Sequence, residues 1–84
     1  MQSATDGAYQ EIANAVVIQA AEDYRNALKG KSYAKTIPPE ILRSRLERFF
    51  RSKWFSILTK IDGEYLIERL NKEHLENNAE KEKK

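Results

Sequence analysis

The sequence predicts an all-α fold: a small compact helical domain of three main helices and one short helix, with a disordered charged C-terminal tail. Apolar residues recur at helical spacing, no segment shows the alternation of a strand, and no internal repeat is present. A chain of 84 residues makes one domain. We expect a frayed N-terminus over residues 1–5, a single helical domain over 6–76, and the disordered tail over 77–84.

The first helix is expected to begin at about Asp6 or Gly7 and to end at Gly30, because glycine commonly ends helices. Ile18 falls on the opposite, polar face of this helix, where it is either a single exposed apolar residue or a contact with a partner. The apolar stripe predicted to face the core contains Tyr9, Ala13, Val16, Val17, Ala20, Tyr24, Ala27 and Leu28.

The second helix is expected from Pro39 to about Arg51, after a basic loop over Lys31 to Ile37. Pro38 and Pro39 stop any preceding helix, and proline suits the first turn of a new one. The outer face of this helix is predicted to carry several arginines.

The apolar residues change from one helical face to another near Ser52, and this change predicts a break in the helix. Leu42, Leu46, Phe49 and Phe50 share one helical face, whereas Trp54, Ile57, Leu58 and Ile61 share a face rotated by roughly 75° at about 100° per residue. Since one straight helix cannot turn both sets inward, we expect Ser52 to cap a short new helix. Phe55 lies outside both stripes.

A second break is expected at Asp62 and Gly63, where Asp62 can cap the last helix. The spacing predicts that this helix turns Leu66, Ile67, Leu70 and His74 toward the core. From Asn77 onward the sequence NNAEKEKK lacks apolar periodicity, and for this reason we expect a disordered, solvated tail.

The net charge of +2 conceals a strong polarity along the chain. Residues 1–24 carry −4 with no Lys or Arg, residues 25–60 carry +8, and residues 61–84 carry −2. With no cysteine, no disulfide or thiolate metal site can form. No apolar run approaches the roughly 20 residues of a membrane span, so we expect a cytoplasmic protein without membrane contact. A core this small makes a homodimer a candidate state.

No motif amounts to an active site, so we expect a protein that is not an enzyme and needs no cofactor or metal. His74 is the single histidine, which leaves a histidine metal cluster or a catalytic triad without support. Asp62 and Glu64 flank Gly63 like the start of a carboxylate loop, but further acidic residues at calcium-loop spacing are missing. A helix cap is the favoured interpretation.

The arginines of the second helix are the main functional signal. Guanidinium groups on one helix face suit phosphates because each offers a planar, permanently charged fork. Such a face could bind nucleic acid, dock on an acidic protein surface, or serve only as a solvated helix side. Phe55 and Ile18 are the candidate apolar anchors. The candidate basic contact residues are Arg43, Arg45, Arg48, Arg51, Lys53, Lys31 and Lys35.

Two segments, VVIQAAEDYRNAL at Val16 to Leu28 and ERFFRSKWFSILTKIDGEYLIERL at Glu47 to Leu70, resemble short uncharacterised helical proteins of phages and integrative mobile elements of Gram-positive bacteria. The resemblance covers roughly half the chain, and the spacer with Pro38 and Pro39 departs from the pattern. It brings no catalytic residues. The matching positions are Tyr24, Arg25, Ala27, Leu28, Phe49, Phe50, Arg51, Ser52, Trp54, Phe55, Asp62, Gly63, Glu64, Tyr65, Leu66 and Ile67.

The resemblance implies a mobile-element setting, in which small non-enzymatic proteins commonly bind host or element machinery, including defence nucleases. We therefore expect an interaction protein that binds, and in the anti-CRISPR or anti-defence manner inhibits, a host protein or a protein–nucleic-acid complex. The alternative is a nucleic-acid-binding accessory or regulatory protein that uses the arginine face of the second helix on phosphates. Phosphate binding should weaken steeply with salt, which distinguishes the two.

Overall fold

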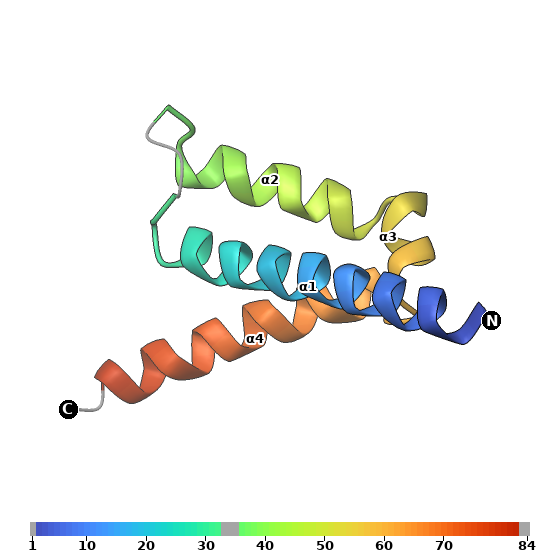
Figure 1. The fold of residues 1–84 in the computed structure, drawn as a ribbon. Helices are drawn as coiled ribbons and strands as arrows, with labels where there is room; N and C mark the ends of the chain where they lie inside the picture. The colour runs from blue at the N-terminus through green and yellow to red at the C-terminus, as the bar shows by residue number, and fades with distance from the viewer. Residues whose placement is uncertain (1, 33–35, 83–84) are drawn as a thin grey trace.

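The computed structural model of the protein describes residues 2–32 and 36–82, and within these ranges it contains four helices and no strand (Figure 1). They are α1 (Gln2–Leu28), α2 (Pro39–Phe50), α3 (Lys53–Leu58) and α4 (Gly63–Glu82). The prediction of an all-α domain with three main helices and one short helix is confirmed.

Helix α1 is the centre of the arrangement, because it contacts each of the other three helices. Helices α2 and α4 lie along it and also contact each other. The chain reverses direction between α1 and α2, and α3 turns it again at the end of the molecule where α1 begins (Figure 1). The result is three long helices closed at one end by a short one.

The buried side of α1 combines small residues with one large aromatic residue. Ala13, Ala20 and Ala27 are buried at seven-residue intervals, which lets a neighbouring helix approach closely, and Tyr24 is completely buried. The helix ends as expected. Gly30 has a φ of 82°, and the Lys31 backbone N–H donates to the Asn26 carbonyl over 2.8 Å.

The start of α1 differs from the expectation. The helix begins at Gln2, not at Asp6 or Gly7, so helical backbone covers most of the stretch expected to be frayed. Starting a helix is unfavourable, because the first turn orders several residues for one hydrogen bond, but the long packed segment that follows has already formed this turn. Each residue added to the N-terminal end then gains one hydrogen bond.

Both predicted breaks are confirmed by their caps. The Phe55 backbone N–H donates to Ser52 Oγ over 3.2 Å at the start of α3, and the Glu64 N–H donates to Asp62 Oδ1 over 3.1 Å at the start of α4. Gly63 is required at the second break, because a Cβ there would lie 1.9 Å from the Phe50 carbonyl oxygen. The first turn of α4 therefore touches the end of α2.

The orientation expected for α3 is wrong for Trp54, Ile57 and Phe55, although Leu58 is buried as expected. Phe55 is only 1% exposed, and its ring centroid lies 5.5 Å from that of Phe49 and 5.5 Å from that of Phe50 in edge-to-face contact. Trp54, by contrast, is 61% exposed. Six residues are too few for apolar spacing to determine which side of a helix faces the core. Contacts among the three phenylalanine rings determine it instead.

Helix α4 turns Ile67 and Leu70 into the core and leaves Leu66 and His74 partly buried, as predicted. Its length was not predicted: the helix continues to Glu82, past residue 77, where the sequence predicts the start of a solvated tail. Glu, Lys and Ala are strong helix formers, and the packed first half of α4 provides the turn on which they propagate.

Candidate interaction surfaces

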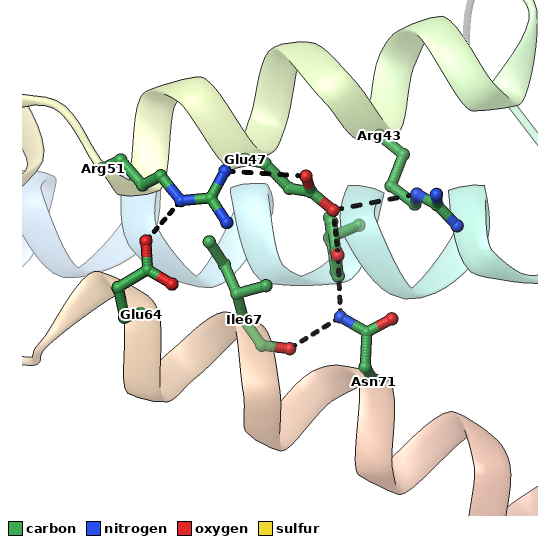
Figure 2. A network of polar contacts seen from close by, with 7 residues as sticks. Arg43, Glu47, Arg51, Glu64, Ile67 and Asn71 are labelled. Carbon is green, nitrogen blue, oxygen red and sulfur yellow. Dashed lines mark hydrogen bonds and ion pairs between the residues drawn. The ribbon is translucent and has the colours of Figure 1, made fainter.

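The four arginines of the predicted contact face do not form one face. Arg43 and Arg51 lie with Glu47 on the flank of α2 toward α4 (Figure 2). At about 100° per residue, Arg45 and Arg48 are turned to other sides of the helix. Arg43 Nε lies 3.7 Å from Glu47 Oε2, and Arg51 Nη1 lies 3.8 Å from Glu47 Oε1. Two of the four positive charges are thus partly neutralised within the protein.

We call the polar contacts between α1, α2 and α4 the seam; it consists of Tyr24, Arg43, Glu47, Arg51, Glu64 and Asn71 (Figure 2). Tyr24 donates its hydroxyl proton to Glu47 Oε2 over 2.6 Å, and Asn71 Nδ2 donates to the Tyr24 hydroxyl over 2.9 Å. Arg51 Nε donates to Glu64 Oε2, which ties the end of α2 to the start of α4. The seam holds the three long helices in register.

The position of Tyr24 in the seam favours its neutral form. Burial and, after it, the hydrogen bond to Glu47 raise the pKa of Tyr24 to about 12. The hydrogen bond with Glu64 likewise raises the pKa of Arg51 above its usual range. Both groups keep their protonated forms throughout the physiological range, so the seam acts as a fixed structural element.

The remaining basic candidates are distributed as follows. Arg45, Arg48, Lys31 and Lys53 are exposed, and within the described chain no ion pair or hydrogen bond engages the charged group of any of them. Lys35 lies outside the described residues. The exposed cations that stay free for a ligand are therefore fewer than the sequence predicts, and they lie on more than one side of the molecule.

Of the two predicted apolar anchors, Ile18 is 61% exposed, as its position on the polar face predicts, and Phe55 is excluded because it is buried. Trp54 takes the place of Phe55. Together with Ile57, which lies one turn further along α3 and is 58% exposed, it forms an apolar surface that we call the α3 patch. Ile61, which follows the end of α3, is also exposed, at 46%. Lys53 and Lys60 flank this patch, and no acidic residue occurs between Arg48 and Ile61.

A second set of exposed apolar side chains was missed. Tyr9, Ile12 and Val16 are 48%, 65% and 41% exposed, although Tyr9 and Val16 were expected to face the core. They share the flank of α1 opposite the one that Arg25 and Leu28 occupy. A signal for this was present in the sequence: Ile12, with Tyr9 and Val16 on either side, extends the apolar stripe beyond the width that one neighbouring helix covers.

A hollow of about 150 Å³ between α1 and α4 offers little to a small molecule. It is lined by Arg25, Leu28, Leu70, Glu73 and His74, among others, but Arg25 Nε already donates to Glu73 Oε1 over 2.9 Å. Among the described residues, no three His, Asp or Glu side chains gather as metal ligands. Nor does any helix in that part of the chain have the length and apolarity needed to cross a membrane.

The candidate site is thus a pair of exposed apolar surfaces beside free cations, on a scaffold that the seam holds together. Comparisons with protein-family models, with curated proteins and with solved structures give no match for this chain, so its function has to be argued from these surfaces.

Proposed function

We propose that the protein is a non-enzymatic interaction protein that binds an acidic protein surface with an apolar centre through the α3 patch. The exposure of Trp54 carries the proposal. A short helix that buries Phe55 and Leu58 has turned its largest residue to solvent, and tryptophan is among the residues that most often dominate binding energy at protein interfaces.

The charge around the patch supports the chemistry of the partner. Lys53 and Lys60 have no ion pair within the described chain, and the segment from Arg48 to Ile61 contains four basic residues and no acidic one. A partner with carboxylates around an apolar pocket complements this arrangement, because opposite charges at the rim speed encounter while the buried centre supplies affinity.

The resemblance to short proteins of phages and integrative elements supports the biological setting of the proposal. In that setting the partner is a host or element protein, free or within a nucleoprotein complex, in the cytoplasm of the host cell. Occupying a surface on such a partner inhibits it when that surface is needed for its own activity, which is how an anti-CRISPR or other anti-defence protein acts.

The test compares capture of partners from host extract by wild-type protein, by Trp54→Ala and by Ile18→Ala. Trp54 and Ile18 are each 61% exposed, so both variants should fold, and circular dichroism checks this. We expect Trp54→Ala to lose the captured partner and Ile18→Ala to keep it. Equal capture by both variants would contradict the proposal.

Nucleic-acid binding is the second candidate, because Arg45 and Arg48 have no acidic partner within the described chain. Titration against labelled duplex and single-stranded DNA at about 50 and 200 mM salt tests it, since several phosphate contacts lose orders of magnitude in affinity over this range. Binding that falls steeply with salt and disappears in Arg45→Glu with Arg48→Glu, but not in Trp54→Ala, would replace the first candidate.

A further inference from the structure

The groove between α1 and α2 has two sides, and α4 covers one of them. On the covered side, Arg25 pairs with Glu73, Tyr24 bonds with Asn71, and Arg51 bonds with Glu64. The side away from α4 carries Tyr9, Ile12, Val16 and Asp23 from α1 and Arg45 and Arg48 from α2. We call these six residues the open face.

Helical geometry places these residues together. At about 100° per residue, Arg25 is rotated from the buried Tyr24 toward α4, whereas Val16 and Ile12 are rotated by about 80° and 120° in the opposite direction. The same holds on α2: Glu47 turns toward α4, and Arg45 and Arg48 turn the other way by about 100° and 160° from Leu46. Because α1 and α2 are antiparallel neighbours, the flanks turned away from α4 form one continuous side (Figure 1).

The open face has an acidic edge and a basic edge at the same level. Tyr24 bonds with Glu47 and its ring contacts that of Phe50, so Asp23 of α1 lies level with the middle of α2, where Arg45 and Arg48 project. Asp23 accepts a hydrogen bond from Gln19 Nε2 over 3.0 Å, and within the described chain no cation pairs with it.

We propose that a second copy of this chain covers the open face, in a two-fold dimer whose axis runs parallel to α1 and α2. This rotation lays the second half of α1 of each copy over α2 of the other, antiparallel to it, and the first half over the end of the molecule that α3 closes (Figure 1). Asp23 of each copy then meets Arg45 and Arg48 of the other, and the stripe of Tyr9, Ile12 and Val16 is buried twice, as an isologous interface requires. The four helices form a bundle of the ordinary antiparallel kind.

Charge selects this dimer over the other two-fold arrangement. An axis perpendicular to the helices would set α1 against α1, and the first 24 residues contain four acidic residues and no Lys or Arg to pair with them. The dimer can be tested apart from the proposed function, because Ile12, Asp23, Arg45 and Arg48 are not residues of the α3 patch.

Sedimentation equilibrium over a range of protein concentrations tests the proposal with two matched variants, Ile12→Lys and Ile18→Lys. Both residues are exposed isoleucines of α1, at 65% and 61%, but only Ile12 lies on the open face. We expect wild-type protein and Ile18→Lys to reach twice the 9.8 kDa chain mass. Ile12→Lys, which disturbs the interface twice, should weaken dimerisation by about 100-fold or more.

A charge exchange tests the arrangement of the two copies. Asp23→Arg should weaken the dimer by about tenfold, and adding Arg45→Asp and Arg48→Asp to it should restore the wild-type affinity, because the pairs reform with their signs exchanged. A wild-type protein that stays monomeric at every concentration would overturn the proposal, as would equal dissociation of the Ile12 and Ile18 variants. Failure of the charge exchange alone would overturn the parallel axis.

Discussion

Arg43 and Arg51 on one flank of α2 share the carboxylate of Glu47, whereas Arg45 and Arg48 on its other sides have no partner in the described chain. The four residues are chemically the same and come from three turns of one helix. Their difference arises from their neighbours: Glu47 lies four residues from Arg43 and from Arg51, and Glu64 of α4 adds a second carboxylate beside Arg51. Charge composition therefore describes this helix poorly, and the positions of Glu47 and Glu64 decide which of its arginines are paired within the protein.

The comparison depends on the packing of α4 against α2, and Gly63→Ala is expected to disturb this packing most. An alanine Cβ would lie 1.9 Å from the Phe50 carbonyl oxygen, and relief of that clash has to move α4 away from the end of α2. We expect a loss of about 3 kcal/mol or more in the free energy of unfolding, measured by urea denaturation.

The matched control for Gly63→Ala is Gly30→Ala. A Cβ at Gly30 meets nothing within 4 Å, and its cost comes only from the φ of 82°. This variant should lose about 1 kcal/mol, the ordinary penalty for a left-handed alanine. Equal losses in the two variants would mean that close contact with α2 is not the reason for glycine at position 63.

Alkaline pH should break the seam next, through Tyr24. Burial and hydrogen bonding raise the pKa of Tyr24 from 10.0 to about 12 in the folded protein. Its contribution to the free energy of unfolding is therefore complete below about pH 10 and is lost as the pH rises toward 12. The loss should reach about 2 to 3 kcal/mol. Urea denaturation of wild-type protein and Tyr24→Phe from pH 8 to 11.5 measures it, and parallel pH profiles for the two proteins would contradict it.

Glu47→Ala should lower the free energy of unfolding by about 2 kcal/mol. It removes the acceptor of the buried Tyr24 hydroxyl and the carboxylate that Arg43 and Arg51 share. Glu40→Ala, at the other acidic position of α2, is the control and should change stability by about 0.5 kcal/mol. Thermal denaturation of both variants separates a specific role of Glu47 from a general effect of charge.

The smallest effect should separate the arginines themselves. Arg51→Gln removes contacts with Glu47 and Glu64, so its urea midpoint should fall slightly, and the fall should shrink as salt screens the pairs. At a protein concentration low enough to keep both variants monomeric, Arg48→Gln should leave the midpoint unchanged, because Arg48 has no such contacts in the described chain. Identical midpoints for the two variants would mean that the contacts of Arg51 with Glu47 and Glu64 add no stability to the protein.

Local signals in the sequence were enough to predict the fold class and both breaks. Ser52 and Asp62 cap helices through hydrogen bonds within a few residues of themselves, so their roles do not depend on distant parts of the chain. The end of α4 was missed because a run of charged residues was interpreted as a solvated tail, although the same residues favour helix.

The arrangement of the surfaces could not be predicted in the same way. Whether Trp54 or Phe55 turns inward depends on the rings of Phe49 and Phe50 across the break, and this is a tertiary contact. The second partner of Arg51 is Glu64 of α4, which lies 13 residues away in the sequence. Only the four-residue spacing of Glu47 from Arg43 and from Arg51 offered a hint in the sequence.

The exposure of Trp54 has a practical consequence for spectroscopy. It is the single tryptophan of the chain, so the intrinsic fluorescence excited at long ultraviolet wavelengths comes from the α3 patch and not from the core. Unfolding should shift this emission little, because the indole is already in contact with water. A bound protein that covers the patch should shift the emission to the blue, which gives the wild-type chain a built-in optical reporter of partner binding.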